Sequence, residues 1–570
     1  MSSRNTLRRH CFIVIVAILA LYQSALGFDL VNWDDDTYLL DSTALHSFDA
    51  ETLQAIWNPM VPRHRFGHEY LPLKDSLFAL DWALASGHPA MFHLTNILLY
   101  LACGVAVLFV LRELLEDDQA ALIGALLFCW HPLHVESVAW AHGRKELLSG
   151  LLTLLAWKSA RRDGLWGVPC ATLLFVAALL AKSTVVFLPL ALLIPTPRDA
   201  LSLKDRLKKS APLFLVSAVF VPFVVLLGRR SGVIVNTMER STLGALWAGF
   251  CLPGWYLLKL FAPWPLQATY PNHQDRVVTD AWHLLGASGT IVLLVTVYLL
   301  RRHRSWPTAR WCLGWALLSL APTLNFFPRG QLFSERYAFL AVLSLSVGLG
   351  ACSRRLIARR GGWLALASIL GLCLCGSAVR LGAWRNGVEL WSSEPAWRAR
   401  SPQVKLKLAE ALTMAGDLDE AEASLKGLLA SDPRHARALL RLAKLEGRRG
   451  NHGRAADALR RIDTSRIRAA HGPTFEGSVY NALAVAVGSQ GGARNLRVAA
   501  ELFGRAFECD PFLYAALYNR ARCFQSISGK KDEAITSWRA YLEATRTAAG
   551  EGEGRREALQ ALAIFERAQR

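Results

Sequence analysis

Long apolar runs separated by short polar loops fill residues 11–382, whereas residues 384–570 carry Arg, Glu and Ala at helical spacing. A helix that crosses the hydrocarbon core of a bilayer needs roughly 20 mainly apolar residues. The first part therefore predicts a multi-pass bundle of membrane-spanning helices, and the second predicts a soluble helical domain. About 11 spans are predicted, centred near residues 19, 101, 128, 151, 173, 190, 219, 292, 317, 344 and 371.

The first apolar run, residues 11–27, admits two interpretations. It follows a basic head that contains Arg4, Arg8 and Arg9, as both a signal peptide and a first membrane span do. Small residues near its end are compatible with cleavage. We favour an uncleaved first span.

Loop charges set the orientation of the spans, because loops rich in Lys and Arg stay in the cytoplasm. The basic loops are residues 161–162, 198–209, 301–310 and 354–360. The loop 28–90 is acidic and therefore external. If the apolar segment 245–262 spanned the membrane, loop 301–310 would be forced outside. We therefore predict an interfacial or re-entrant helix there, interrupted at Pro253 and Gly254. This choice places the tail on the external side, together with loop 28–90.

The tail repeats with a period of 34 residues, which is the spacing of tetratricopeptide repeats (TPR). Ala409, Gly416 and Ala421 recur as Ala443, Gly450 and Ala455. A generic helical bundle is the alternative. Two further units contain Tyr480, Ala499, Ala506 and Pro511, and then Tyr518, Ala521, Gly529 and Ala534.

The predicted organisation is thus a membrane domain (1–382), a connector (383–402), TPR-type repeats (403–546) and a helical tail (547–570). Such arrays form a curved α-solenoid that commonly holds an extended polypeptide. The net charge of +19 does not indicate a nucleic-acid partner, because much of it lies in loops beside apolar runs and no recognition motif accompanies it. The expected partner of the membrane domain is the lipid bilayer.

Three adjacent carboxylates, Asp34, Asp35 and Asp36, follow the first span. Because like charges repel, at least one of them has a raised pKa unless a cation, a metal or a substrate hydroxyl relieves the repulsion. A solvated acidic turn is an equally good interpretation from the sequence alone.

His131, His134 and Glu136 form a second group of chemically active side chains. Imidazole and carboxylate suit zinc or manganese, so these residues are candidate ligands for a divalent metal. A structural role, in hydrogen bonds between loops, fits the same pattern. Arg144 and Lys145 are suited either to neutralising a lipid phosphate or to anchoring at the interface. Other candidates are His93, Asn96, His142, Glu146, Lys182, Arg329, Glu335, Arg336 and Tyr337.

Several motifs occur in the order of one known family: VNWDDDTYLL, MFHLTNILLY, HPLHVESVAW, GRKELLSG, LLAKSTVVFLPL, WYLLKLFAPWPLQATYP and SERYAFLA. They resemble the transmembrane and tetratricopeptide-repeat-containing (TMTC) proteins and their bacterial relatives, which are similar to protein O-mannosyltransferases of the GT-C fold. The resemblance implies a GT-C-like domain that transfers a hexose, typically mannose, from a polyprenyl phosphate to Ser or Thr hydroxyls on the outer face of the membrane. It also implies a bacterial inner membrane with the repeats in the periplasm.

Site residues follow from the same resemblance. The family's acidic pair corresponds to Asp34 and Asp35, with Asp36 an additional carboxylate. Lys182 is followed by Ser183, where relatives commonly have Glu, so the role of that Glu is in doubt here. We expect phosphate-binding cations at Arg144, Lys145, Lys182 and Arg336, and supporting roles for His93, His131, His134, Glu136, Glu146 and Glu335.

No cofactor is predicted beyond the candidate divalent metal. Two other functions fit the same sequence. One is a non-enzymatic scaffold for envelope or secretion complexes. The other is glycosyl transfer to a lipid or a polysaccharide.

Overall fold

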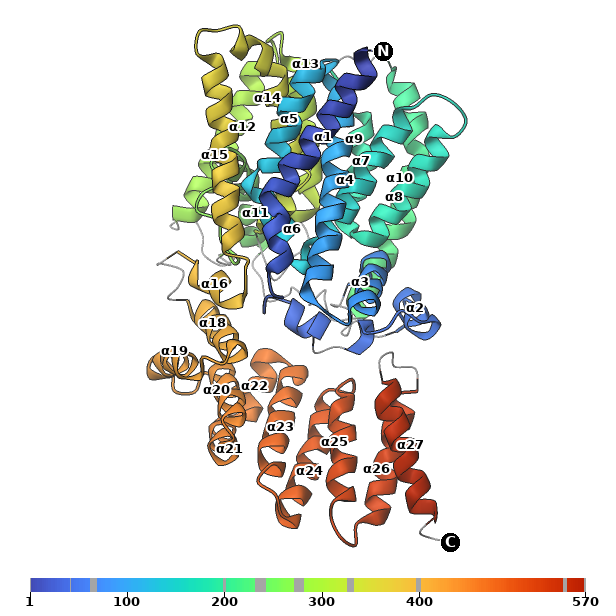
Figure 1. Ribbon diagram of the computed structural model, residues 1–570, viewed down its shortest axis with the longest axis vertical. Helices are drawn as coiled ribbons and strands as arrows, with labels where there is room; N and C mark the ends of the chain where they lie inside the picture. Colours follow the sequence, from blue (N-terminus) through green and yellow to red (C-terminus); the bar gives the residue numbers. More distant parts are fainter. Residues whose placement is uncertain are drawn as a thin grey trace. The chain divides into compact units, whose positions relative to one another are not determined.

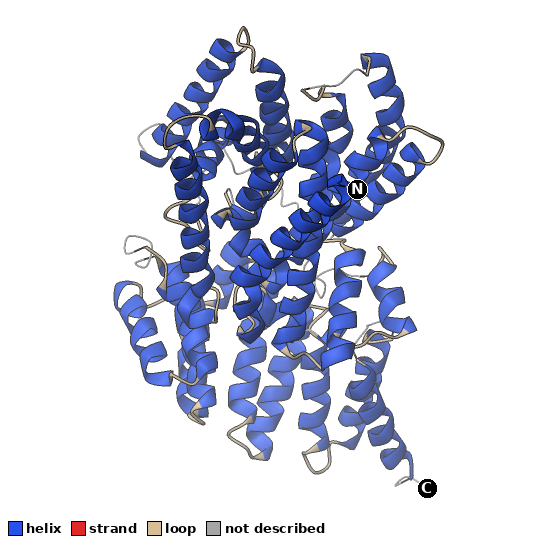
Figure 2. Cartoon of the chain, turned by 45° about the horizontal axis from the view of Figure 1, so that its top comes forward, coloured by secondary structure: helices blue, strands red, loops and turns tan. Residues whose placement is uncertain are grey.

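The computed structural model describes residues 2–40, 43–61, 69–197, 201–230, 242–270, 281–324, 333–395, 401–546 and 551–567. Throughout these residues every regular element is a helix and no strand occurs (Figure 2). This confirms the predicted all-α class. The chain divides into two compact units, one of Met1–Leu39 with Pro62–Ser393 and the other of Leu40–Val61 with Glu394–Arg570.

The first unit contains the apolar helices, and all predicted span centres fall inside them (Figure 1). Five helices are long and apolar enough to cross a membrane in the described residues, or up to six if α5 and α6, bent by 53°, form one span. The total of about 11 spans stays a prediction. The helices are α1 Ser2–Tyr22, α3 Pro72–Ala85, α4 Pro89–Leu115, α5 Asp118–Trp130, α6 Val135–Ala139, α7 Arg144–Arg161, α8 Gly167–Ala181, α9 Leu188–Leu193, α10 Leu203–Arg230, α11 Thr242–Phe261, α12 Ala281–Leu300, α13 Trp306–Leu320, α14 Val342–Ile357, α15 Gly362–Gly382 and α16 Gly387–Ser392.

Close helix packing in this unit depends on small residues. Helix α4 packs against α1, α5 and α7, and α5 packs against α14. A Cβ atom at Gly104 would lie 2.7 Å from the Cδ1 of Ile18, and one at Gly124 would lie 2.6 Å from the backbone oxygen of Ser346. Between helices in lipid, where water provides no driving force, such close approach is a main source of attraction.

Helix α11 corrects the expectation that Pro253 and Gly254 interrupt the 245–262 segment, because the helix continues through both. The hydroxyl of Thr290, on α12, bridges the turn where the proline disturbs the backbone. It accepts a hydrogen bond from the Gly254 N–H (2.9 Å) and donates one to the Phe250 oxygen (2.8 Å). A side chain from a neighbouring helix thus replaces a backbone bond, which is a known way for a helix to tolerate proline. The interfacial position of this helix stays a prediction.

The second unit contains the repeat helices. The alanines that define the period, Ala409, Ala421, Ala443 and Ala455, are buried, as expected where paired helices approach closely. Gly416 and Gly450 adopt φ of 95° and 77°, a left-handed conformation that ends a helix and that glycine adopts readily. The helices are α2 Ala50–Trp57, α18 Pro402–Ala415, α19 Leu418–Ser431, α20 Ala436–Arg448, α21 His452–Arg460, α22 Thr464–His471, α23 Pro473–Gly488, α24 Ala493–Cys509, α25 Tyr514–Gln525, α26 Lys531–Ala544 and α27 Gly552–Arg567.

Adding one methyl group at Gly254 should separate α11 from α12. A Cβ there would lie 1.9 Å from the Gly286 oxygen and 2.5 Å from the Thr290 nitrogen, whereas a Cβ at Gly371 has no atom within 4 Å. We expect Gly254→Ala to cost about 1–3 kcal/mol through overpacking, and the matched Gly371→Ala to be neutral or stabilising. Thermal unfolding of the full chain in detergent measures both. Equal midpoints for the two variants would contradict the close α11–α12 contact.

Candidate functional site

The acidic turn after α1 contains one deeply buried carboxylate. Asp35 is 1% exposed, and its Oδ2 accepts a hydrogen bond from the Val31 N–H (3.2 Å). Its Oδ1 lies 3.0 Å from the Nδ1 of His142. Asp36 is also buried, whereas Asp34 is partly exposed. The three carboxylates therefore occupy different environments, and Asp34 is the one most accessible to solvent.

Burial decides the protonation of the Asp35–His142 pair. It raises the pKa of the Asp35 carboxyl well above its ordinary value, with smaller contributions from neighbouring charges. Burial also lowers the pKa of His142. Both effects favour the uncharged forms. A protonated Asp35 that donates a hydrogen bond to a neutral His142 agrees with the raised pKa of Asp35 and the lowered pKa of His142.

Cations surround His142. After burial, the positive charges of Lys74, Lys145, Arg144 and Arg336 are the next causes of its lowered pKa. Rings of Phe78, Trp140 and Tyr38 enclose the imidazole at centroid distances of 5.1, 5.7 and 5.7 Å. The acidic turn thus lies next to a concentration of positive charge.

Arg144 is fully buried at the start of α7. Its guanidinium donates to the Asp81 carboxylate on α3, to the Asn96 Oδ1 (3.2 Å) and to the Phe92 oxygen (3.1 Å), both on α4. The Asn96 amide in turn donates to the backbone oxygen of Trp140 (2.9 Å). Arg144 therefore ties α3, α4 and α7 together.

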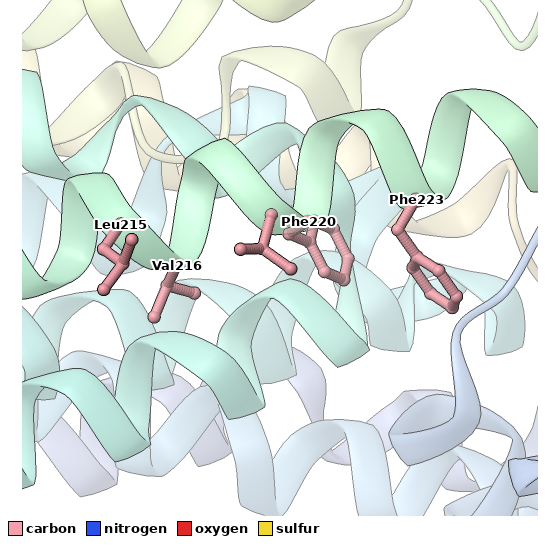
Figure 3. Close-up of a pocket in the computed structure, with 5 residues that line it drawn as sticks. Leu215, Val216, Phe220 and Phe223 are labelled. Carbon is pink, nitrogen blue, oxygen red and sulfur yellow. The ribbon is translucent and has the colours of Figure 1, made fainter.

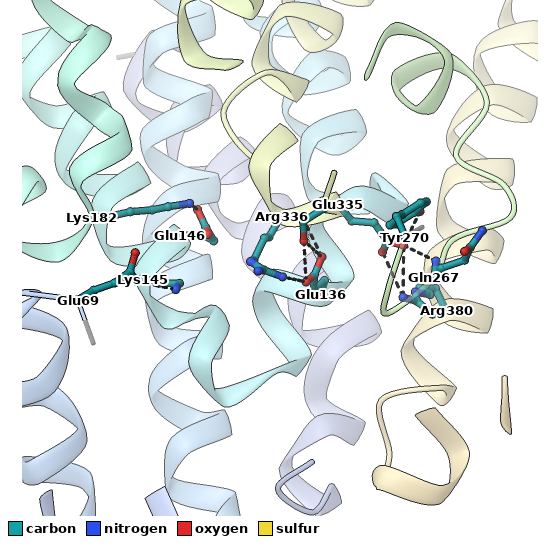
Figure 4. A network of polar contacts seen from close by, with 11 residues as sticks. Glu69, Glu136, Lys145, Glu146, Lys182, Gln267, Tyr270, Glu335, Arg336 and Arg380 are labelled. Carbon is teal, nitrogen blue, oxygen red and sulfur yellow. Dashed lines mark hydrogen bonds and ion pairs between the residues drawn. The ribbon is translucent and has the colours of Figure 1, made fainter. Parts of the chain in front are cut away.

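Two buried glutamates hold the segment that precedes α14 (Figure 4). Glu136, on α6, pairs with the Arg336 guanidinium and also accepts the Arg336 backbone N–H (2.9 Å). Glu335 accepts the Tyr270 hydroxyl (3.0 Å) and lies 3.3 Å from the Arg380 guanidinium on α15. The adjacent residues Glu335 and Arg336 thus bind different helices: Glu335 binds α15 and Arg336 binds α6.

Lys182 pairs with Glu146 of α7 (Figure 4). Its ammonium group also lies 5.2 Å from the Tyr337 ring centroid. Glu146 therefore supplies the carboxylate next to Lys182 in a chain that has Ser183 after the lysine. A cavity of about 20 Å³ adjoins this pair, enough for one water molecule.

Lys145 differs from the other cations because its carboxylate partner is exposed. Its Nζ lies 3.1 Å from the Glu69 Oε2, and the side chains are 16% and 46% exposed. The carboxylates paired with Arg144, Lys182 and Arg336 are at most 5% exposed. An incoming anion can therefore reach Lys145 most easily.

An apolar hollow lies on α10 (Figure 3). The Tyr70 ring packs edge-to-face on Phe223 at 5.6 Å, and Tyr70 directly follows Glu69. The apolar surface on α10 is thereby connected to Lys145, because Tyr70 contacts Phe223 and Glu69 pairs with Lys145. The hollow has a volume of about 310 Å³ and is lined by Leu215, Val216, Val219, Phe220 and Phe223.

The candidate metal ligands point to separate partners. His131 Nε2 lies 3.0 Å from the Leu260 oxygen. His134 uses Nδ1 for the Tyr100 hydroxyl (2.8 Å) and Nε2 for the Phe339 oxygen (3.1 Å). Within the residues that the structure describes, no group of three His, Cys, Asp or Glu is placed to hold a metal ion. These contacts fit the structural role, in hydrogen bonds between loops, that the sequence left open, and the metal-ligand interpretation stays a prediction. His93 is buried, and its ring lies 6.3 Å from the Phe28 ring.

The structure brings most of the other candidates into one region of the first unit. Sequence reasoning missed Asp81, Lys74 and Glu69. A usable signal existed, since Lys74, Asp75 and Asp81 interrupt an otherwise apolar stretch, and charges in such stretches are default functional candidates. Arg329 lies outside the described residues.

Fold and site together define a class: a helical membrane body with a buried ionic site, carrying a repeat array. A family model described as tetratricopeptide repeat matches residues 515–544, which contain most of α25 and all of α26. This confirms a tetratricopeptide repeat in the fourth predicted unit.

Curated relatives add a further comparison, over about a quarter to a third of the chain. Protein O-mannosyl-transferase TMTC3 is 32% identical in Homo sapiens and 33% in Mus musculus, over 26% of this chain and 17% and 16% of those proteins. Protein O-mannosyl-transferase Tmtc2 of Drosophila melanogaster is 30% identical over 31% of this chain and 20% of its own length. These matches support a TMTC-like family assignment, although they span at most a fifth of each of these relatives. With the apolar helices, they identify an integral membrane protein.

Replacing Asp35 with Asn should preserve both of its hydrogen bonds. The amide donates to His142 Nδ1, and its oxygen accepts the Val31 N–H. Because the folded pKa of Asp35 is raised, its stabilising contribution is complete below about pH 4 and is lost as pH rises toward the folded pKa. We therefore expect Asp35→Asn to gain stability relative to the native chain as pH rises above about 4.

Unfolding midpoints from pH 4 to 8 in detergent measure this difference. Asp35→Ala is the comparison: it leaves Val31 N–H and His142 unpaired and should cost about 1–3 kcal/mol. If Asp35→Asn lowers the unfolding midpoint as much as Asp35→Ala does, then Asp35 is ionised in the folded state.

Proposed function

We propose that the chain is a membrane glycosyltransferase that uses a polyprenyl-phosphate-linked sugar. It transfers mannose or a similar hexose to Ser or Thr hydroxyls of exported proteins. The observation that carries this proposal is the 3.0 Å contact of Asp35 with His142, which brings the acidic turn, with the partly exposed Asp34, to the cations near His142. Such a site combines a base for a hydroxyl with positive charge for a phosphate leaving group. The names of the relatives support transfer of mannose to protein.

Asp34 is the better general base of the family's acidic pair. Both Asp35 oxygens are hydrogen-bonded and burial favours its protonated form, so Asp35 is a positioning residue that fixes the turn through His142. Asp34 takes the hydroxyl proton as the acceptor oxygen bonds to the anomeric carbon. The bond from that carbon to the phosphate oxygen breaks, the phosphate leaves with the electron pair, and the configuration inverts. Buried Asp36 contributes negative charge to the turn.

Lys145 is the cation that meets the phosphate. A phosphate displaces the exposed Glu69 carboxylate at lower cost than any buried partner, because Glu69 returns to water. Arg144, Lys182 and Arg336 remain in their ion pairs, which fix the helices around Lys145. The polyprenyl chain lies along the apolar hollow of α10 (Figure 3). Tyr70, which contacts Phe223 in this hollow, directly follows Glu69.

The membrane arrangement completes the proposal. About 11 spans, with the basic loops in the cytoplasm, place the acidic turn and the repeats on the external, periplasmic side of a bacterial inner membrane. There the repeats hold the polypeptide acceptor. A scaffold without transferase activity has no need of a carboxylate and cations gathered in one place.

Asp34→Asn should remove transfer without unfolding the protein. Purified full chain in lipid nanodiscs is given polyprenyl-phosphate-[14C]mannose and exported proteins, and protease-sensitive label is measured. Losing a general base should lower the rate by about 10²–10⁴-fold. Glu51→Gln, an exposed residue of the same acidic loop, is the matched control.

Normal transfer by Asp34→Asn would remove the base assignment. Label found in lipid or polysaccharide instead of protein would favour that alternative acceptor. If the native chain transfers nothing while envelope complexes are lost in cells that lack it, the scaffold function is favoured.

Changes at Lys145 and Glu69 should have opposite effects on donor binding. Lys145→Gln removes a charged hydrogen-bond donor, worth about 1.5–3 kcal/mol, and should raise the donor KM about 10–100-fold. Glu69→Gln removes the competing carboxylate and should lower the donor KM. Donor titrations at saturating acceptor measure both variants. A raised KM in Glu69→Gln would mean that Glu69 supports the donor and does not compete with it.

A further inference from the structure

A hollow of about 370 Å³ lies where α7 ends and α8 begins. Hydrogen bonds fix the connecting loop: the Gly167 N–H donates to the Gly164 oxygen (3.4 Å), and the Ser159 hydroxyl donates to the Gly167 oxygen (3.1 Å). Lys209, on α10, also donates to the Arg162 oxygen (3.3 Å). The hollow is therefore a preformed feature of the first unit. Its charged and apolar lining includes Leu155, Lys158, Arg162, Leu165, Trp166 and Leu174.

Several cations lie around this hollow. Lys158 and Arg161 share the single carboxylate of Glu113, at 2.9 and 2.8 Å. Lys209 pairs with Asp163 at 3.2 Å. Arg162 is exposed and has no ion pair among the residues that the structure describes. Within the part of the chain that the structure describes, Arg162 therefore adds a positive charge that no carboxylate pairs with, which leaves charge for an anionic ligand.

The rim of the hollow is apolar and open. Leu165 is 84% exposed and Trp166 is 73% exposed, directly after the charged residues of the loop. Tryptophan prefers the headgroup level of a bilayer, where its ring meets both polar and apolar groups. A free phosphate would use the cations but not this rim. A ligand with an anionic head and an apolar body uses both.

The hollow is separate from the proposed transfer site. Arg144 begins α7 and Arg161 ends it, so the 18-residue helix separates the two ends by about 25 Å. The basic charge of loop 161–162 predicts a cytoplasmic position, and anionic lipids are concentrated in that leaflet.

We propose that this hollow binds the headgroup of an anionic phospholipid. Arg162 and Lys158 contact the phosphate, while Trp166 and Leu165 pack against the glycerol and the first acyl carbons. The site anchors the α7–α8 end of the membrane body to the anionic leaflet. It requires no transferase activity.

Lipid titrations of the purified full chain in neutral detergent test this proposal. Phosphatidylglycerol should raise the unfolding midpoint more than phosphatidylcholine at equal concentration, because a ligand that binds the folded state stabilises it. Arg162→Gln should weaken apparent phosphatidylglycerol affinity about five-fold, corresponding to roughly 1 kcal/mol per basic residue near anionic lipid. Arg302→Gln, exposed in another basic loop, is the matched control and should leave the affinity unchanged.

Trp166→Ala provides a second measurement, since it removes apolar contact without changing charge, and it should also weaken binding. Equal stabilisation by phosphatidylglycerol and phosphatidylcholine would overturn the proposal, as would wild-type affinity in both Arg162→Gln and Trp166→Ala. An equal shift from inorganic phosphate at the same concentration would identify a phosphate site in place of a lipid site. Since transfer is not measured, failure of the proposed function does not affect the result.

Discussion

Charged side chains buried between apolar helices must find partners, and this requirement organises the membrane body. A lone charge moved out of water costs several kcal/mol, and breaking a buried pair costs about 3–5 kcal/mol. Here the pairs cross between elements: Arg144 joins α7 to Asp81 of α3, and Arg336 joins the segment before α14 to Glu136 of α6. In lipid, where the hydrophobic effect does not hold helices together, such pairs specify which helices are neighbours.

The same requirement separates structural charges from chemical ones. A cation whose carboxylate is fully buried cannot exchange that partner without leaving a charge stranded. A cation whose carboxylate reaches water can, because the released carboxylate is solvated again. By this criterion Lys145, with Glu69, is suited to binding, whereas Arg144 is suited to building the site on which binding depends. The acidic turn follows the same rule, with Asp35 buried and Asp34 partly exposed.

The sequence predicted the features that repeat along the chain, namely helices and repeat units. It did not predict which side chains pair with one another. Apolar runs placed the helices, and the 34-residue spacing of alanine and glycine found the repeats, because both signals are local. The partner of Arg144 is 63 residues away on a helix with no family motif. The continuity of α11 through Pro253 depends on a hydroxyl from Thr290, which no local pattern contains. The backbone partners of His131 and His134, Leu260 and Phe339, are likewise invisible in a sequence.

Helix α7 carries charged residues at both ends of an apolar stretch. Its first turn carries Arg144, Lys145 and Glu146 into the ionic site, and its last turn carries Lys158 and Arg161 to the other end. The apolar residues between them leave nowhere for these charges except the two ends. Both ends are further fixed by bonds to other helices, Arg144 to Asp81 and Arg161 to Glu113. The position of this helix within the first unit is therefore set from both ends at once.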